Sequence, residues 1–254
     1  MRPDIRERAS APEVVTALVQ HHRNLKTVFF TAYIPRPPIE ERLAHDSALQ
    51  PLLERLRAFS QKASLDLAWE ELAVAAAFQS ENLDRALRET GAHSAVGEGE
   101  GFALPAAEVR TDRLQTMIQE VNTRGKVLAV CSRCLLTTGA VAHIPMMDFR
   151  CKILGENLAR IKLAVSSIAG EPGVLLTSGR SYHWYGYGLM EQEEWVTFLS
   201  TCLLYAPLVD ARYIAHRLKE RNAVLRISNG GIKPETPSVV GFTEAAKRAA
   251  KGLD

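Results

Sequence analysis

The feature that most constrains the fold is a pair of strand–turn–strand patterns in the second half of this 254-residue chain. The first runs "KVLAVCSRCLL", "TTG", "AVAHIPMMDFRC" over residues 126–151, with its turn at Gly139. The second runs "GVLLTS", "GR", "SYHWYGYG" over residues 173–188, with Arg180 in its turn. Runs of β-branched and aromatic residues on either side of a short glycine-containing turn are typical of β-hairpins.

Helical patterns are interleaved with these hairpins. Apolar residues recur at helical spacing in residues 110–125, where Gly125 is the expected C-terminal stop, and again in three later segments. The later segments are 157–170, 191–204 and 210–222, and "AVLRIS" at 223–228 is a final strand. Helices interleaved with hairpins predict an α+β fold with its sheet covered on one face.

The first part of the chain has a different texture. Helical spacing extends over the first ninety or so residues, as in "APEVVTALVQHHRNL" and in the later runs 37–63 and 64–89. "TGAHSAVGEGEGFALP" at 90–105 is rich in glycine and small residues, which favours a linker or a mobile loop. We therefore expect two parts, a helical N-terminal region over 1–104 that ends in this loop and an α+β domain over 105–254.

Composition and charge narrow the classes of partner. The chain is 46% hydrophobic and 24% charged, with a net charge of +2, as in an ordinary globular protein. Residues 126–190 carry seven Lys or Arg against three Asp or Glu, and 203–254 carry nine against five, so an anionic partner would prefer the C-terminal half. Without a leader, a bilayer-spanning apolar run or a cysteine-rich pattern, the expected location is cytoplasmic, away from the membrane.

Two acids stand at positions where carboxylates do chemistry. Asp148 ends an apolar strand, so it is either paired with Arg150 or a loop amide, or it is a ligand for a hard cation such as Mg²⁺ or Mn²⁺. Asp210 directly precedes a helical pattern, so it is either the N-cap of that helix or a second carboxylate delivered to the same site.

One face of the second hairpin gathers polar and aromatic side chains. Alternation along a strand places Ser181, His183, Tyr185 and Tyr187 on the same side, behind Arg180 in the turn. A hydroxyl, an imidazole and a guanidinium within four residues favour a phosphate-binding site, although a lone histidine is more often structural. The two tyrosines are either stacking platforms for bases or part of the core.

The spacing of the cysteines permits a zinc site, but their place in a strand pattern argues against one. Cys131 and Cys134 form a CxxC pattern, with His143 and Cys151 downstream. The CxxC lies within a strand pattern, so its two side chains would point to opposite faces. We expect neither a zinc site nor a disulfide.

Read in order, three short motifs resemble those of the archaeo-eukaryotic primase superfamily, which includes the primase-polymerases. They are an acid at the end of an apolar strand ("IPMMDF"), a Ser-x-His strand ("GRSYHWY") and a hydrophobic-Asp pair before a helix ("LVD"). "LRISNGG" also resembles the Leu-Arg run that follows the third motif in primases. The resemblance covers about residues 126–237, and the order of the motifs makes it more specific than any one of them.

The resemblance implies an RRM-like antiparallel sheet core with a companion α/β element. It also implies that Asp148 and Asp210 hold Mg²⁺ or Mn²⁺ for nucleotidyl transfer, and that Ser181 and His183, with Arg180 at the rim, hold a nucleoside triphosphate. Arg226 would contact the triphosphate or a template. The implied partners are therefore a nucleoside triphosphate and DNA or RNA.

One departure from the superfamily pattern concerns the first motif, which has two acids in primases and one here. Depending on the alignment, Met146 or Arg150 replaces the missing acid, and neither side chain can bind Mg²⁺. The chain thus resembles the divergent single-aspartate branch, the primase 1D-like group, in which two-metal polymerisation is in doubt.

Three hypotheses of function follow from this pattern. In the first, the chain is a primase-polymerase-like nucleotidyltransferase that binds nucleotide and nucleic acid, with polymerase activity that is intact, reduced or lost. Alternatively, it is an inactive module of the same fold that binds nucleotide or single-stranded nucleic acid. In the third hypothesis it is an adaptor whose helical N-terminal region, within 1–104, docks a protein partner.

Overall fold

The computed structural model of the protein describes residues 2–37, 99–206 and 208–245, with isolated positions at 41, 47, 50, 51, 53 and 54. Its contacts divide the chain into two compact units. One unit comprises Met1–Pro35 with Val96–Asp254, and the other comprises Arg36–Ala95. The helices expected over 37–63 and 64–89 lie almost wholly outside the described residues, so the account below concerns the first unit.

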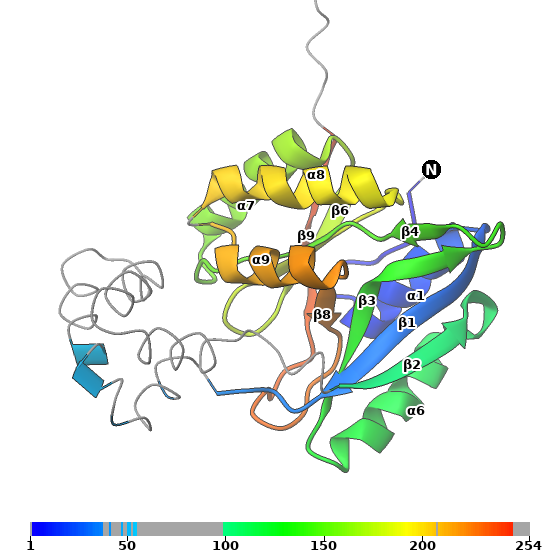
Figure 1. The fold of residues 1–254 in the computed structure, drawn as a ribbon, viewed down its shortest axis with the longest axis horizontal. Coiled ribbons are helices and arrows are strands. Elements are labelled where there is room, and N and C mark those ends of the chain that lie inside the picture. The colour runs from blue at the N-terminus through cyan, green and yellow to red at the C-terminus, as the bar shows by residue number, and fades with distance from the viewer. Residues whose placement is uncertain are drawn as a thin grey trace, which may run out of the picture. The chain divides into compact units, whose positions relative to one another are not determined.

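The described part of that unit alternates helices and strands along the chain (Figure 1). In order, the elements are α1 (Ala11–His21), β1 (Leu25–Tyr33), β2 (Glu100–Pro105), η2 (Ala106–Glu108), α6 (Thr111–Asn122), β3 (Val127–Leu136), β4 (Val141–His143), β5 (Met146–Asp148), α7 (Gly155–Ala169), β6 (Gly173–Thr177), β7 (Tyr182–Gly186), α8 (Gln192–Cys202), η3 (Leu203–Tyr205), α9 (Ala211–Glu220), β8 (Val224–Arg226) and β9 (Ser238–Thr243).

The strands form two antiparallel sheets. The first sheet has the order β2-β1-β3-β4, with β8 also paired to β3, and the second has the order β5-β7-β6-β9. Both predicted hairpins are present, and their turn glycines, Gly139 and Gly179, have φ values of +87° and +98° that side-chain-bearing residues rarely adopt. The α+β class is therefore confirmed, whereas an RRM-like core stays a prediction.

Two segments of the N-terminal region, one expected to be helical and the other to be loop, form strands instead. Residues Leu25–Tyr33 form strand β1, which lies between β2 and β3 in the first sheet. The run "TVFFTAY" within it is β-branched and aromatic, and it buries Val28, Phe30 and Ala32 almost completely. Glu100–Pro105, expected to be loop, forms strand β2 by pairing with β1. Pairing with a strand that is distant in sequence thus decides its structure, against the local preference of the glycine-containing segment.

The predicted division into 1–104 and 105–254 stays a prediction about functional parts. By packing alone, residues 1–35 belong to the same compact unit as the α+β domain.

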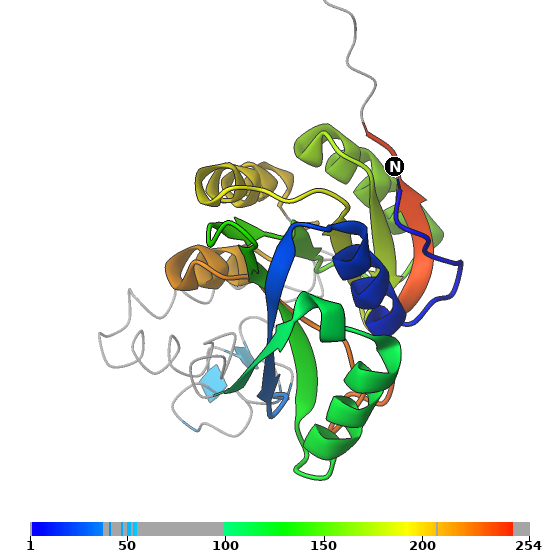
Figure 2. The same ribbon diagram turned by 90° about the vertical axis from the view of Figure 1, so that its right-hand side faces the viewer.

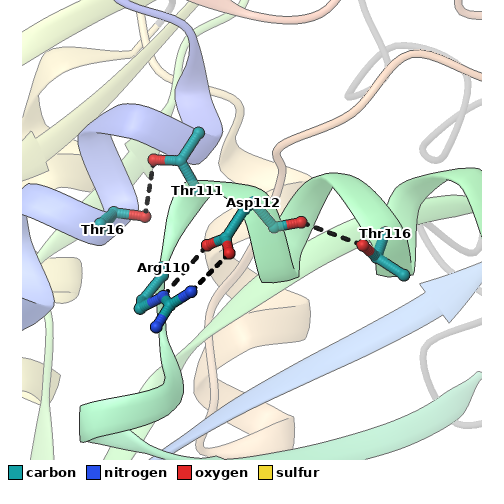
Figure 3. A network of polar contacts seen from close by, with 5 residues as sticks. All are labelled: Thr16, Arg110, Thr111, Asp112 and Thr116. Carbon is teal, nitrogen blue, oxygen red and sulfur yellow. Dashed lines mark hydrogen bonds and ion pairs between the residues drawn. The ribbon is translucent and has the colours of Figure 1, made fainter.

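Helices α1 and α6 pack against one face of the first sheet. Figure 2 shows α1 beside β1 and β9, and the N-terminus of α1 adjoins β9 through the amide of Ala11, which donates to the carbonyl of Pro237 over 2.7 Å. At the start of α6 the hydroxyl of Thr111 donates to that of Thr16 over 3.3 Å (Figure 3). Apolar side chains of both helices join the strands in one core, among them Val14, Leu18, Leu114, Met117 and Val121.

Strand β7 is buried on both faces. Trp184 packs against Phe198 of α8, with ring centroids 5.8 Å apart, and its indole N–H donates to Thr243 over 3.0 Å. On the opposite face, His183 and Tyr185 are buried as well. Tyr185 and Tyr187, which the sequence left as either stacking platforms or core residues, both belong to the buried core.

The chain passes from one sheet to the other at Pro145. β4 ends at His143 in the first sheet, and β5 begins at Met146 in the second. Proline lacks an N–H and therefore suits this break between ladders, while its carbonyl still accepts the amide of Gly186 over 2.9 Å. This crossing carries Asp148 to the place where the two sheets meet.

Candidate functional site

Main-chain hydrogen bonds bring the three motif segments side by side. The amide of Phe149 donates to the carbonyl of Tyr182 over 2.9 Å, which joins the first motif to the second. On the other side, the amide of Arg150 donates to Leu208 over 2.9 Å, and the amide of Asp210 lies 3.4 Å from the carbonyl oxygen of Asp148. Residues 148–150 therefore lie between the Ser-x-His strand and the segment that leads into α9.

Asp148 and His183 are direct partners across the β5–β7 ladder. Their side chains meet, with His183 Nε2 3.7 Å from Asp148 Oδ1. The aspartate side chain is 25% exposed and the histidine side chain 7% exposed, so a ligand can reach the carboxylate more easily than the imidazole. The carboxylate thus marks the solvent-facing side of this pair.

His183 is held neutral by its surroundings. Burial lowers its pKa to about 3, and the positive charges of Arg226 and Lys233 add to the shift. Its Nδ1 atom is buried and has no hydrogen-bond partner among the described residues. A buried polar atom without a partner costs about 1–3 kcal/mol, so the imidazole presents unused hydrogen-bonding capacity toward this junction.

Asp210 has the N-cap role that its position before a helix allows. Its Oδ1 accepts the amide N–H groups of Arg212, at 3.0 Å, and Tyr213, at 3.3 Å, in the first turn of α9. Its Oδ2 lies 3.6 Å from the guanidinium of Arg212. The residue is buried, and its main-chain amide faces the carbonyl of Asp148. Its carboxylate, however, already stabilises the start of α9.

Ser181 and Arg180 lie at the end of the β6–β7 hairpin. The Ser181 hydroxyl donates to the carbonyl of Phe149, so its proton is used to fasten the two motif segments together. Arg180 is exposed in the turn and lies near enough to Lys233 to lower the pKa of that lysine. The predicted phosphate-binding trio is therefore close together, with the hydroxyl engaged in a structural bond.

Arg226 braces two loops beside the junction. Its guanidinium donates to the carbonyls of Ser228, of Glu235 over 2.7 Å and of Ser178 over 2.7 Å. These bonds tie the β6–β7 turn to the loop between β8 and β9. Burial lowers the pKa of Arg226, and the charge of Asp148 opposes that shift. The arginine thus adds positive charge here while most of its donors serve the main chain.

Three residues of this junction are missed by sequence reasoning. Lys233 is half-buried and acts electrostatically on His183, and its own pKa is lowered by burial and by Arg226 and Arg180. Tyr33, from β1, lies near Arg226, and burial raises its pKa. Tyr185 was identified only as a stacking or core residue, but its buried hydroxyl has no partner among the described residues, and burial raises its pKa.

The donor set for a metal is small. Within the described ranges, no group of three or more His, Cys, Asp or Glu side chains is arranged to hold a metal ion. Cys131 and Cys134 are free and buried, and burial raises the pKa of Cys134 to about 12, which disfavours the thiolate that zinc requires. Asp148 and Asp210 remain the carboxylates nearest to the junction, and Met146, one candidate for the missing acid, is fully buried.

Comparison with known families identifies the class of protein that this fold and junction define. The family model for AEP-like proteins, archaeo-eukaryotic primase 1D-like, matches residues 105–237, more than half of the chain. The chain therefore belongs to the archaeo-eukaryotic primase 1D-like family, and the resemblance drawn from the three motifs is confirmed. Neither curated proteins nor solved structures give a significant match.

Membership sets a coarse functional frame. The family is of the nucleotidyltransferase type, and primase-like proteins generally bind nucleotides and nucleic acids and use divalent metals. Across the described residues, no helix is both long and apolar enough to cross a membrane.

Proposed function

We propose that the chain binds a nucleoside triphosphate at the junction of β5, β7 and β8, as a nucleotidyltransferase domain whose polymerase activity is reduced or lost. The observation that carries the proposal is a buried imidazole with an unused nitrogen, at His183, beside Asp148 and the cations Arg226 and Lys233. Membership in the primase 1D-like family supports the same ligand class.

The charges of the junction suit a compact anion. Arg226 and Arg180 both act electrostatically on Lys233; Asp148 opposes the charges of Lys233 and Arg226, and Glu235 opposes that of Arg226. Charge-assisted hydrogen bonds from such groups to phosphate oxygens are among the stronger polar interactions in proteins. His183, being neutral, adds no charge, and it would donate one hydrogen bond to a phosphate oxygen only if the ligand reached its buried ring.

Each residue of the predicted site has a defined part in this proposal. Arg180 is exposed and would reach the outer phosphates from the turn, whereas Arg226 would hold the loops and supply positive potential. Ser181 would contact phosphate only if its hydroxyl left the carbonyl of Phe149, so its main part is to fasten the first two motifs together. Asp148 is the acid that a cation can reach.

The donor set fits one hard cation better than two. Mg²⁺ or Mn²⁺ is commonly held by one or two carboxylates together with the phosphates of the substrate, which Asp148, helped by Asp210, would provide. The cation would neutralise charge on the phosphates. The position of Met146 is fully buried and offers no carboxylate for a second ion, which is why we propose slow or absent polymerisation.

The alternative proposal is a catalytically inactive module that binds nucleotide or single-stranded nucleic acid. It is favoured by one specific observation, namely that the Asp210 carboxylate caps α9. Among the described residues it also belongs to no group of three or more side chains that could hold a metal ion. Binding of DNA or RNA and docking of a protein partner through the N-terminal region remain proposals in either case. The location in the cytoplasm remains a proposal as well.

Calorimetric titration of the full chain with ATP and dATP, with Mn²⁺ or with EDTA, tests the proposal. We expect binding that is strengthened by Mn²⁺ and weakened by Asp148→Asn. A primer-extension assay on the same protein then bears on the two alternatives, since any incorporation above background would exclude the inactive module. Primer synthesis that is robust and unaffected by Asp148→Asn would contradict the site assignment.

A further inference from the structure

Glu171 fills a space that two glycines leave open at the end of β7. It directly follows Gly170, the C-cap of α7, whose φ is +63°. Its carboxyl group lies against Gly186 and Gly188, and a Cβ at either glycine would overlap one of the carboxyl oxygens. Glycine at these two positions therefore allows the carboxyl group to pack directly against the main chain.

The two oxygens of this carboxyl group have different surroundings. Oε2 accepts the amide N–H of Gly188 over 2.8 Å. Oε1 is buried and has no hydrogen-bond partner among the described residues. The amide next to it in the chain, that of Tyr187, already donates to the carbonyl of Pro172 over 3.0 Å. An ionised carboxylate accepts several hydrogen bonds, so a buried oxygen without a donor favours the neutral acid.

The charges around Glu171 favour the neutral acid as well. The residue lies at the C-terminal end of α7, where the helix dipole is negative. Among the described residues, no charged side chain acts on it. The titratable groups nearest along the opposing segment belong to Tyr187, which interacts with Arg2 and Glu244, and to His22, whose ring bonds the main chain of Tyr187. Burial raises the pKa of Glu171 to about 7, and one hydrogen-bonded amide offsets this only in part.

We propose that Glu171 is a proton-operated latch, whose protonated carboxyl group holds residues 186–188 against the end of α7 and whose loss of a proton to solvent loosens that segment. The residue is partly exposed, so water can take up and return the proton. The segment that it holds joins β7, which carries His183, to α8. The inference is independent of the proposed function, because no nucleotide takes part in it.

The direction of the pH effect follows from the two protonation states. The ordinary pKa of a glutamate is 4.5, and that of folded Glu171 is about 7. Between these values the folded chain keeps a proton that the unfolded chain has lost, so the free energy of unfolding falls as the pH rises and levels off above pH 7. Local opening of residues 186–190 releases the same proton, so this segment should open more often at pH 8 than at pH 5.

The test compares the wild type with Glu171→Gln and with a matched control, Glu120→Gln, in the full chain. Glutamine has nearly the shape of the protonated acid and cannot ionise, and Glu120 is an exposed glutamate on α6. Urea denaturation at pH 5 and pH 8 gives the unfolding equilibrium constant of each protein. Relative to Glu171→Gln, the constant of the wild type should rise by about tenfold to a hundredfold between the two pH values. Glu120→Gln should follow the wild type.

Hydrogen exchange followed by mass spectrometry tests the local part of the inference. The rates are first corrected for the intrinsic pH dependence of amide exchange. Peptides that cover residues 186–190 should then lose protection between pH 5 and pH 8 in the wild type and keep it in Glu171→Gln. Peptides from α6 should behave alike in both proteins.

Three results would overturn the inference. A stability difference that is the same at both pH values would show that ionisation of Glu171 plays no part. Lower stability of Glu171→Gln at pH 8 would show that the ionised carboxylate is the form that holds the segment. A pH-dependent difference without a change in exchange at residues 186–190 would show a global effect and no latch. If Glu171→Gln does not fold, the wild type alone decides, since unchanged protection of residues 186–190 contradicts the latch and its loss at pH 8 supports it.

Discussion

His143 and His183 are two buried histidines whose surroundings differ in one respect. In His143, Nδ1 lies 3.1 Å from the Ser132 hydroxyl and Nε2 lies 3.1 Å from Gln192 Oε1, and the ring stacks on Trp195 with centroids 4.4 Å apart. In His183, Nε2 lies 3.7 Å from Asp148, and Nδ1 has no hydrogen-bond partner among the described residues. Burial lowers the pKa of both imidazoles, so both are neutral at pH 7.

The difference separates a polar network that serves the fold from one that we propose to bind a ligand. Around His143, the Ser132 hydroxyl also accepts the amide of Ala223 over 2.8 Å, so the network joins β3, β4 and the start of β8. Around His183, positive charge gathers and donors lack acceptors. A depressed pKa alone is a weak reason to propose a functional histidine, whereas a missing partner beside clustered cations is a stronger one.

The largest expected effect is on stability, from His143→Leu. Leucine fills much of the volume but leaves Gln192 and Ser132 without their ring partners, so we expect the free energy of unfolding to fall by about 3 kcal/mol. Urea denaturation measures this as a lower midpoint at an unchanged slope. A loss below about 1 kcal/mol would show that the network does not hold the two strands together.

The same substitution at the second site, His183→Leu, should act on binding instead. Because it removes a buried polar atom that lacks a partner, we expect stability to stay within about 1 kcal/mol of wild type. Nucleotide affinity should fall by about tenfold to a hundredfold, as measured by calorimetry. If His183→Leu destabilises the protein as much as His143→Leu does, the contrast between the two sites collapses.

A smaller effect concerns pH. The pKa of folded His183 is about 3, below its ordinary value of 6.5. Above pH 6.5 neither state is protonated, so the site contributes nothing. Below it, the unfolded chain takes up a proton that the folded chain does not, and the native state loses about 1.4 kcal/mol per pH unit. His183→Leu lacks this loss. We therefore expect the free energy of unfolding of the variant, relative to that of the wild type, to be about 1 kcal/mol higher at pH 5.5 than at pH 7.5. Urea denaturation of both proteins at the two pH values measures this difference.

An exposed ion pair provides the smallest effect. Arg110 and Asp112 are bonded over 2.6 Å at the start of α6, with side chains 63% and 66% exposed (Figure 3). The guanidinium lowers the pKa of Asp112 to about 2. Solvent screens such pairs, so Asp112→Asn should leave the urea midpoint within experimental error. A clear shift would mean that exposed polar contacts matter here as much as buried ones.

Much of the fold follows from local patterns. The hairpin turns at Gly139 and Gly179 and the helices α6 to α9 were predictable, because apolar spacing and glycine placement act over a few residues. β1 and β9 were not predicted. "TVFFTAY" carries a strand signal, but it follows directly on a helical run, and β9 is a short segment interrupted by Gly241.

The junction was predictable only in part. The order of the motifs places Asp148, His183 and Asp210, and the structure brings them together, although their function stays a proposal. Lys233 could not be found in this way, because a lysine in a glycine-rich turn normally faces solvent. Tyr33 lies near Arg226 because β1 and β8 both pair with β3, and no local pattern encodes such contacts between distant parts of the chain.

The crossing of the three motif segments through main-chain bonds has a consequence for tolerance to sequence change. Amide and carbonyl groups, which every residue except proline supplies in full, set the distances between residues 148–150, 181–183 and 208–210. These bonds do not depend on which side chains stand at positions 149 and 182, although both side chains here are buried in the core. A proline at position 149 would remove the amide that donates to Tyr182, and the Ser181 hydroxyl would then be left to join that end of the two segments through the carbonyl of residue 149.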